Sequence, residues 1–307
     1  MNILMCTDGE EYAELAIRFG GRLAKGLNAD VSILHVRPTV SSADRVQLMA
    51  TRKRLGEWDL DIPGVDHLKR AKDILTQVGL TKTVTAGQKE GRAFQEGVLG
   101  ATELHLMGPQ GENVRLRLRE GKPVEQILEE AEAGNYNLII TASRGHKGIS
   151  RYFVGSTALR VADLAPCSVL IAKNIREDTD FLMCTDGSPV SEQAEIFGAS
   201  LAGALGASVT VLSVGEEGTA VTDVEERVRR AEMVLAQMGV AARTVVRTGR
   251  PSEVIIEEAQ DHDIVVMGTS GGSAVRRFFL GSVPLKVIEY GECPVLIVRE
   301  KRERLPL

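Results

Sequence analysis

Residues 263–300 read DIVVMGTSGGSAVRRFFLGSVPLKVIEYGECPVLIVRE, and this stretch decides the fold. Two apolar runs, DIVVMGT and PVLIVRE, flank the helical segment SVPLKVIEYG. Strands that are apolar on both faces are typical of parallel sheets covered by helices on both sides. A strand, a helix and a second strand in this order predict a right-handed crossover within such a sheet.

The residues upstream of this stretch complete one domain. FLMCT, SVTVLSV and RTVVRT read as strands, while SEQAEIFGASLAGALG and VEERVRRAEMVLAQMG read as helices. Pro251 then opens a further helix, because proline is favoured in the first helical turn. The β-α-β-α-β-α-β-α-β series predicts an α/β fold. We expect an open, doubly wound, Rossmann-like sheet of five parallel strands in the order 3-2-1-4-5.

The first half of the chain repeats the second. NILMCTDG from Asn2 answers DFLMCTDG from Asp180, and later REGKPVEQILEEA answers RTGRPSEVIIEEA. We therefore predict two tandem domains of the same fold, residues 1–175 and 176–307. The linker KNIREDTD is short, so we expect the two domains to pack directly together.

Two insertions distinguish the first domain. Shifts in register between the copies place them at about residues 37–66 and 81–118. In the second insertion, TELHLM and VRLRLRE alternate in polarity around the turn-rich GPQGEN, which predicts an inserted β-hairpin. Its apolar face must be covered, and we expect it to pack on the domain pair or to form a homodimer contact.

The strand ends of the second domain carry residues suited to phosphate binding. Ligands of doubly wound sheets bind where the winding reverses, between the first and fourth strands. Thr185-Asp186 follows the first strand, Gly268-Thr269-Ser270-Gly271 follows the fourth, and Gly281-Ser282 begins the last helix. Glycines admit close approach of backbone N–H groups, and a helix N-terminus attracts anions. The alternative is that these glycines only make tight strand-to-helix turns.

The pattern G-x-x-G-x9-G-S after a fourth parallel strand resembles the nucleotide loop of the universal stress protein family. The resemblance covers nearly the whole chain twice and includes the opening TDG, GRPSEVI and the closing CPVLIV. It implies a regulatory or stress-response protein that binds ATP, ADP or AMP, with Mg²⁺ as a candidate companion ion. It also implies that the two copies pair as the subunits of a dimer would. The candidate nucleotide-binding residues are Thr185, Asp186, Val214, Met267, Gly268, Gly271, Gly281, Ser282 and Val283.

The first copy departs from this pattern at Ala142, which replaces the first glycine. Its Cβ is expected to crowd a phosphate, and to resist a positive φ if the site needs one. We therefore expect binding mainly through the second domain. A degenerate site in the first domain would use Asp8, Val36, Gly145, Gly155 and Ser156.

The composition limits the other classes of function. A net charge of -5 offers no basic surplus for a nucleic-acid partner. The chain shows no signal peptide and no apolar run near the ~20 residues of a membrane helix, so we expect a cytoplasmic protein without a membrane partner. It has no CxxC, HExxH or GxxxxGK[ST], so we assign no metal site and no catalytic residue. The four cysteines read as buried thiols in core strands.

Two rival functions stay open. One is an enzyme, a slow ATPase or a nucleotidyl transferase, for which Asp186 is the one well-placed candidate group. The other is an interaction scaffold that binds no nucleotide. We expect at most weak ATP hydrolysis, because no base, metal-binding acid pair or committed lysine accompanies the glycine-rich loop.

Overall fold

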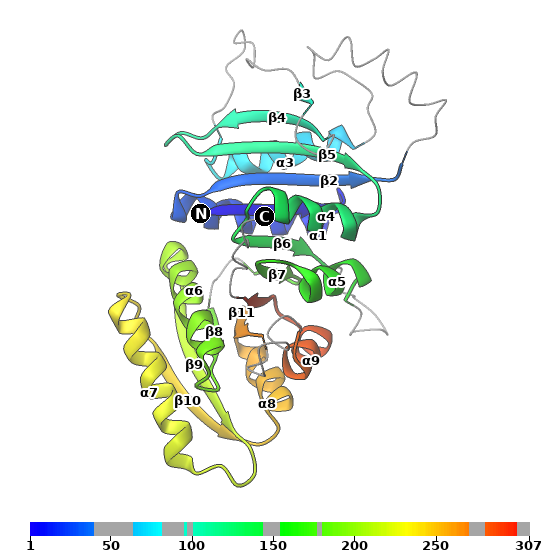
Figure 1. The fold of residues 1–307 in the computed structure, drawn as a ribbon. Coiled ribbons are helices and arrows are strands. Elements are labelled where there is room, and N and C mark those ends of the chain that lie inside the picture. Colours follow the sequence, from blue (N-terminus) through cyan, green and yellow to red (C-terminus); the bar gives the residue numbers. More distant parts are fainter. Residues whose placement is uncertain are drawn as a thin grey trace, which may run out of the picture. The chain divides into compact units, whose positions relative to one another are not determined.

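The structure, a computed structural model, describes residues 1–39, 64–81, 95–96, 101–143, 154–176, 180–269 and 280–299. The chain divides into two compact units, Met1–Ile140 and Thr141–Leu307 (Figure 1). Within the described ranges, no helix has both the length and the apolar character that crossing a lipid bilayer requires. The domain boundary predicted near residue 175 follows the sequence repeat rather than these units, and it stays a prediction.

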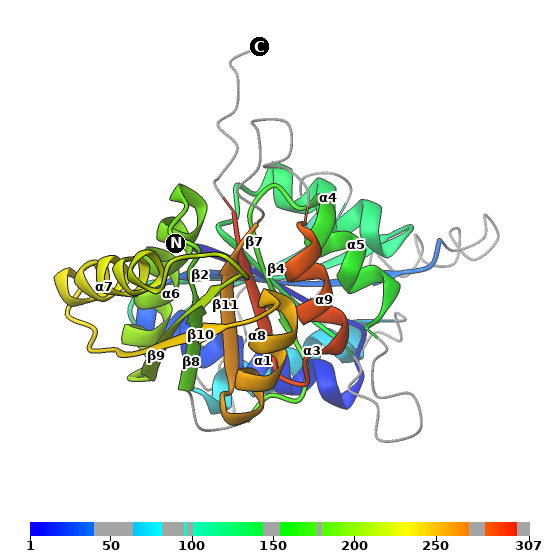
Figure 2. The ribbon, with the colours of Figure 1, turned by 90° about the horizontal axis from the view of Figure 1, so that it is seen from below.

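The second repeat, inside the second unit, follows the expected series of strands and helices. Its elements are β8 (Asp180–Cys184), α6 (Pro189–Leu205), β9 (Ser208–Gly215), α7 (Val221–Gln237), β10 (Arg243–Thr248), α8 (Pro251–Glu258), the 3-10 turn Ala259–Asp261, β11 (Ile264–Gly268), α9 (Ser282–Tyr290) and β12 (Val295–Val298). The strands are parallel in the order β10-β9-β8-β11-β12, which is 3-2-1-4-5 in chain order. Helices α6 and α7 cover one face, and α8 and α9 cover the other (Figures 1 and 2).

Helix α6 shows how local sequence sets these bounds. Pro189 begins the helix, and the side chain of Ser188 accepts a hydrogen bond from the Ser191 N–H at 3.3 Å. Gly206 ends it in the left-handed conformation, at φ 64°. Between these caps, the buried face includes Ala194 and Leu201, which pack against the sheet. The helix is therefore specified at both ends and along one side.

The first repeat has the same core with additional strands. Its elements are β1 (Asn2–Thr7), α1 (Glu11–Leu27), β2 (Asp30–Arg37), α3 (Val65–Gln77), β3 (Gln95–Glu96), β4 (Thr102–Met107), β5 (Asn113–Glu120), α4 (Pro123–Ala133), β6 (Leu138–Ala142), α5 (Ser156–Leu164) and β7 (Ser168–Ala172). From β1 to β6, the strand order is β6-β1-β2-β5-β4-β3. The α/β fold with a mostly parallel sheet is thus confirmed in both repeats.

The hairpin predicted in the first repeat is present, but one of its strands belongs to the repeated core. Strands β4 and β5 pair antiparallel, with Leu104 opposite Leu116. Strand β5 also pairs in parallel with β2, as β10 does with β9. The added strands are therefore β3 and β4, and the insertion is shorter than 81–118 because Asn113 already begins the third core strand. Matched residues on either side of an insertion give its length, but they do not show where between them the insertion lies.

The closing strands of the two repeats pair with each other inside the second unit. Strand β7 runs antiparallel to β12, with Leu170 opposite Leu296. These strands carry the CSVLIAK and CPVLIVR sequences that we expected near an interface between the copies. A pseudo-two-fold relation between the complete domains stays a prediction.

Two buried cations reinforce this strand pair. Lys173, just after β7, donates hydrogen bonds to the carbonyls of Ile288 and Gly291 at the end of α9. Arg299, its counterpart (299 − 173 = 126, as 281 − 155 = 126), donates to the carbonyl of Asp163 at the end of α5, at 2.9 Å. The last carbonyls of a helix lack intrahelical partners, so each cation satisfies a helix end of the other repeat.

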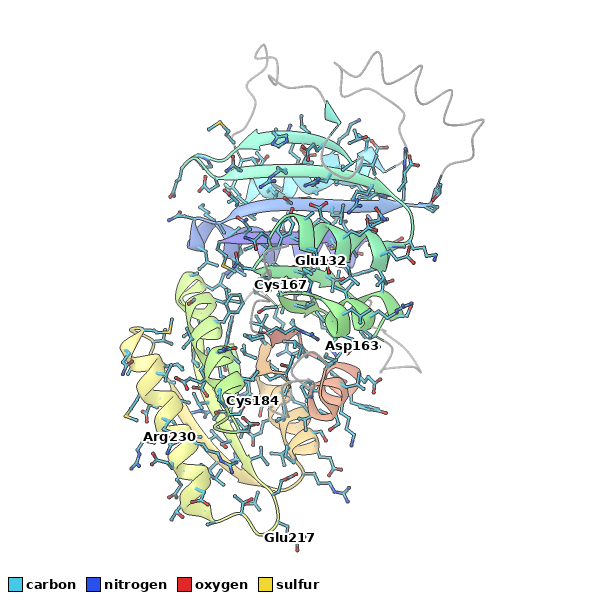
Figure 3. All side chains as sticks on the ribbon, viewed as in Figure 1. Glu132, Asp163, Cys167, Cys184, Glu217 and Arg230 are labelled. Atoms are coloured by element: carbon cyan, nitrogen blue, oxygen red, sulfur yellow. The ribbon has the colours of Figure 1, made fainter. Side chains whose placement is uncertain are left out.

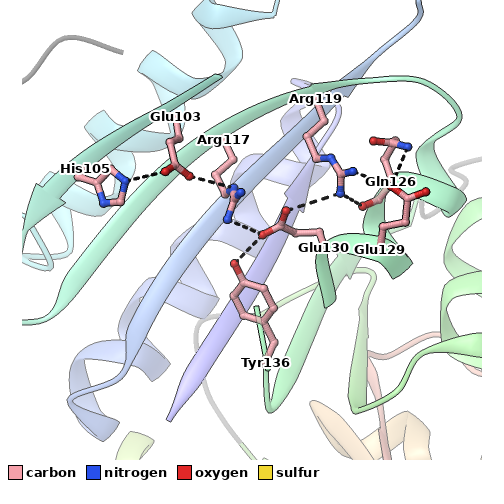
Figure 4. A network of polar contacts seen from close by, with 8 residues as sticks. All are labelled: Glu103, His105, Arg117, Arg119, Gln126, Glu129, Glu130 and Tyr136. Atoms are coloured by element: carbon pink, nitrogen blue, oxygen red, sulfur yellow. Dashed lines mark hydrogen bonds and ion pairs between the residues drawn. The ribbon is translucent and has the colours of Figure 1, made fainter. Parts of the chain in front are cut away.

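A buried polar network joins the added strand β4 to the core of the first unit (Figure 4). Glu130 of α4 is fully buried and accepts from Arg117 at 2.8 Å and from the Tyr136 hydroxyl at 3.0 Å. Arg119 lies 3.6 Å from its second oxygen. Glu103 of β4 pairs with Arg117 at 3.4 Å from the other side. Charges so deeply buried are tolerated only when they are paired in this way.

The four cysteines confirm the expectation of buried thiols. Cys6, Cys167, Cys184 and Cys293 are all free and buried. Figure 3 shows Cys184 on β8 among packed side chains, whereas Arg230 lies on the exposed side of α7. Burial raises the pKa of the Cys293 thiol to about 11 and that of Cys184 further, so both stay protonated near neutral pH.

Candidate functional site

A pocket of about 330 Å³ opens at the carboxyl ends of β8, β9 and β11, where the winding of the sheet reverses. Pockets for small ligands span roughly 300–1,000 Å³. The predicted residues that line it are Thr185, Asp186, Val214, Met267, Gly268, Ser282 and Val283. Gly281 precedes Ser282 as the N-cap of α9, and Gly271 lies outside the described residues.

The loop after β8 holds a carboxylate at the wall of this pocket. The Oδ1 atom of Asp186 accepts from the Ser188 N–H at 2.9 Å. Thr185 Oγ1 accepts from the Gly187 N–H at 3.2 Å. Gly187 has a φ of +75°, which favours glycine, and an added Cβ would lie 2.9 Å from Arg227 Cγ. The Ser188 N–H thus orients one Asp186 oxygen, and the carboxylate is an acceptor for hydroxyl or amino groups.

The structure gives a packing reason for glycine at position 268, in addition to the expected close approach of a phosphate. A Cβ there would lie 2.8 Å from Val190 Cγ1 and 2.9 Å from the Val190 carbonyl oxygen. Its φ is not positive, and neither is that of Ala142. Glycine thus lets the first turn of α6 pack against the end of β11. Neither position needs a positive φ, so Ala142 carries no strain of that kind.

Helix α9 begins at the pocket with two backbone donors. Its first residues are Ser282 and Val283, and the third, Pro284, has no N–H. The Leu285 N–H is already bonded to the Gly281 carbonyl at 3.0 Å. Among the described residues, the N–H groups of Ser282 and Val283 have no hydrogen-bond partner, and both residues line the pocket. A helix N-terminus of this kind favours a phosphate or carboxylate, and the Ser282 hydroxyl adds a further donor.

The structure adds pocket residues that sequence reasoning missed. Arg227 of α7 lines the pocket, together with Glu216 and Thr219 from the segment after β9. Arg227 forms no ion pair within the described part of the chain, and its aliphatic portion rests on Gly187. Its counterpart in the first repeat is His67 (227 − 160 = 67, as 239 − 160 = 79 for the glycines). This arginine-for-histidine difference was a signal visible in the sequence.

In the first repeat, the carboxylate in the loop after β1 accepts hydrogen bonds from residues of its own unit. The Tyr12 hydroxyl donates to Asp8 Oδ2, and the Glu10 N–H donates to Asp8 Oδ1 at 3.2 Å. The counterpart of Tyr12 in the second repeat is Val190 (190 − 178 = 12), whose side chain has no hydrogen-bond donor. Both carboxylate oxygens of Asp8 are therefore engaged, unlike the pocket-lining Asp186.

Two histidines occupy the space beside this loop. The rings of His35, at the end of β2, and His67, on α3, lie 4.7 Å apart at 58°. A Cβ on Gly9 would lie 1.9 Å from His67 Nδ1, so this ring rests directly on the glycine. His35 Nδ1 donates to the Thr7 carbonyl at 2.8 Å. Burial is the main cause that lowers the pKa of His35, and His67 lowers it further.

The degenerate set predicted for the first domain is distributed over both units. Asp8 and Val36 lie in the first unit, while Gly155 and Ser156 begin α5 in the second. The Gly155 N–H donates to Ser143 Oγ at 3.2 Å, so this helix end already has a protein contact. Gly145 lies outside the described residues, and so do residues 40–63, most of the insertion predicted at about residues 37–66.

Sequence comparison finds the same family in both halves of the chain. The model described as "Universal stress protein family" matches residues 1–173 and again 179–299. Universal stress protein Slr1230 of Synechocystis sp. is 24% identical over 305 residues, which are 97% of this chain and 99% of that protein. A universal stress protein of Thermus aquaticus is 35% identical over 132 residues, 38% of this chain and 96% of its own length.

Comparison of structures leads to the same fold. The crystal structure of a universal stress protein from Archaeoglobus fulgidus DSM 4304 superposes with a TM-score of 0.66 at 19% identity. The match covers 97% of this chain and 98% of that one. A putative universal stress protein from Pseudomonas aeruginosa UCBPP-PA14 gives a TM-score of 0.60 at 16% identity, over 97% of this chain and 92% of its own. At these identities the likeness concerns the fold alone.

Proposed function

Because this chain belongs to the universal stress protein family, we propose that it is a nucleotide-responsive regulatory protein whose second domain binds an adenine nucleotide. The observation that carries the proposal is the pocket at the reversal point, with the Asp186 carboxylate at one lip and a helix N-terminus at the other. The proposed ligand is ATP, ADP or AMP. We propose at most weak hydrolysis of ATP by this protein.

The pocket offers a partner for each part of such a ligand. Asp186 would accept hydrogen bonds from ribose hydroxyls, and Val214, at the end of β9, would lie against the adenine. The N–H groups of Ser282 and Val283 would receive the phosphates, with Gly268 keeping the strand end narrow beside them. The volume of about 330 Å³ also suits a ligand of this size.

Arg227 adds to this scheme a charge that the sequence argument did not include. Guanidinium groups bind phosphate through paired hydrogen bonds and also stack on aromatic rings. The pocket wall around Arg227 also includes the carboxylates of Asp186 and Glu216, so the described lining is not strongly positive. We therefore propose that backbone donors, rather than a cluster of cations, provide most of the contact with phosphate.

The direct test is to identify what the purified protein carries. Protein denatured after gentle purification should release an adenine nucleotide detectable by mass spectrometry. Binding of added ATP, ADP, AMP, cAMP and dAMP should then be measured one by one. The last two are the ligands named for two solved universal stress proteins. If no member binds, the proposal fails and the scaffold alternative stands. Rapid hydrolysis of ATP with Mg²⁺ would favour the enzyme alternative.

A further inference from the structure

Helix α9, whose first residues line the pocket, is held at both ends by residues of the first repeat. At its carboxyl end, Lys173, just after β7, donates a hydrogen bond to the Ile288 carbonyl at 2.6 Å. At its start, the Leu280 N–H donates to Asp163 Oδ1 at 3.2 Å. Leu280 directly precedes Gly281, the N-cap of α9. Helix α5 and strand β7, which position these two contacts, belong to the first repeat but lie in the second compact unit.

Asp163 is itself held by contacts between the two repeats. It lies in the last turn of α5 (Figure 3). Its backbone carbonyl accepts from Arg299 at 2.9 Å, and Arg299 is buried just after β12. Strand β7, which follows α5 in the chain, pairs antiparallel with β12. Contacts on both elements therefore hold the Asp163 backbone beside the start of α9.

The corresponding start of α5 is not built in this way. Asp163 corresponds to Glu289 (289 − 126 = 163). Leu280 corresponds to Val154 (280 − 126 = 154). Both counterparts lie in the described part of the chain, and no hydrogen bond joins the Glu289 side chain to the Val154 N–H. The N-cap N–H of α5 instead donates to Ser143 Oγ of its own repeat, at 3.2 Å. Within the described residues, an acid of the other repeat therefore holds only the helix that begins at the pocket.

We propose that Asp163 is a positioning residue for phosphate in the second domain, so that the α5–β7 segment of the first repeat completes the nucleotide site. This inference rests on the proposed function. Asp163 is not among the residues that line the pocket, so it acts through the Leu280 N–H and not on the ligand. Backbone donors bind an anion best when their direction is fixed before the ligand arrives. An acceptor for Leu280 fixes the residue before the N-cap, and with it the direction of the Ser282 and Val283 N–H groups.

This role needs the hydrogen-bond acceptor of Asp163 and not its negative charge. A carboxylate near the phosphates repels them, so the charge by itself weakens binding. Asparagine keeps the Oδ1 acceptor and removes the charge, whereas alanine removes both. Positioning therefore predicts that Asp163→Asn and Asp163→Ala differ in affinity for a phosphate-bearing ligand. A purely electrostatic effect predicts that they behave alike.

Calorimetric titration of the full chain with ATP and with adenosine separates positioning from folding, because only ATP carries phosphates. Asp163→Ala should lower the affinity for ATP by about three- to tenfold and leave that for adenosine unchanged. Asp163→Asn should keep the affinity for ATP at or above the wild-type value. Asp163→Val, which resembles aspartate in shape but has no acceptor, should behave like Asp163→Ala and serves as a second variant if alanine folds poorly.

Glu289→Ala is the matched control, because it removes the corresponding half-buried acid, on α9 itself. It should leave both affinities unchanged. Equal affinity for ATP in Asp163→Ala and wild type, or equal losses for ATP and adenosine, would overturn the positioning role while leaving nucleotide binding intact. A gain in affinity for ATP in both Asp163→Asn and Asp163→Ala would also overturn it, because the carboxylate would then act by repulsion alone. Absence of nucleotide binding in the wild type would instead remove the proposed function, and the positioning role with it.

Discussion

The carboxyl ends of β1 and β8 carry the same Thr-Asp-Gly sequence but open onto different surroundings. In the first repeat, Tyr12 donates to Asp8, and the His67 ring rests on Gly9. In the second repeat, Asp186 lines a pocket of about 330 Å³, and the flexible side chain of Arg227 replaces the imidazole. In the first copy, side chains of the protein itself contact the loop at the carboxyl end of the strand. In the second copy, the same loop is available to a ligand.

The opposite ends of the same strands show no such divergence. The Asn2 N–H donates to Asn137 Oδ1 at 2.9 Å, and the Asp180 N–H donates to Asp263 Oδ2 at 3.0 Å. The matching backbone bonds, from residues 137 and 263 back to residues 2 and 180, are both 2.9 Å long. The amino edge therefore keeps a structural contact in both copies, while the carboxyl edge differs between them. Function in doubly wound sheets is located at that carboxyl edge.

The largest difference in stability that we expect between the copies concerns an ion pair present in both, Arg119–Glu130 and Arg247–Glu258. Glu130→Ala leaves Arg117 and Arg119 buried without their shared acid, so we expect a loss of about 3–5 kcal/mol in the free energy of unfolding. Glu258→Ala, at the corresponding position (258 − 128 = 130), breaks a pair with Arg247 that is partly exposed. There we expect about 1 kcal/mol or less. Urea unfolding with hydrogen exchange of α4 and α8 peptides separates the two effects.

A further variant sharpens that comparison. Arg117→Val copies Val245 of the second repeat (245 − 128 = 117) and leaves Glu130 with Arg119 and Tyr136. It should therefore cost less than Glu130→Ala. Equal losses for Glu130→Ala and Glu258→Ala would show that the buried network adds nothing beyond an ordinary surface pair.

The two copies should also respond to pH with opposite sign. Burial raises the pKa of Glu195 to about 7, so between pH 4.5 and pH 7 the folded state binds more protons than the unfolded state. The stability of the second unit should fall by about 2 kcal/mol as pH rises from 4.5 to 7, after discounting the shift for solvent screening. The pKa of His35 is lowered below 6.5, so the first unit should lose stability as pH falls below that value.

Hydrogen exchange measured between pH 5 and 7, corrected for intrinsic rates, reports these two slopes separately for peptides of α1 and α6. Glu195→Gln should abolish the slope in α6 and leave that in α1 unchanged. Parallel slopes in both units, or an unchanged slope in the variant, would contradict the assignment of these groups.

The elements of the second repeat were predictable because their signals are local. Pro251 and Gly206 mark helix ends, and the apolar runs of β11 and β12 are those of strands covered on both faces. The candidate pocket residues followed from the same reasoning, because the carboxyl ends of β8 and β11 meet at the reversal point.

The remaining features depend on contacts between distant segments. A Cβ at Gly268, the last residue of strand β11, would collide with Val190 of helix α6, and no local pattern around position 268 shows this. The hairpin insertion was misplaced because the third strand VRLRLRE alternates like an added strand, although it pairs with β2. The histidine pair and Glu195 were missed because a lone histidine or acid gives no periodic signal. Each becomes visible only when the two copies are compared position by position.

The central claim is that one chain has one nucleotide site, in the second domain. Calorimetry with ATP and Mg²⁺ should give a stoichiometry near one per chain. Asp186→Asn should weaken binding by about tenfold or more, equivalent to about 1.4 kcal/mol. The matched variant Asp8→Asn should leave affinity and stoichiometry unchanged. Two equal sites in the wild type, or a single site lost in Asp8→Asn and kept in Asp186→Asn, would contradict the account.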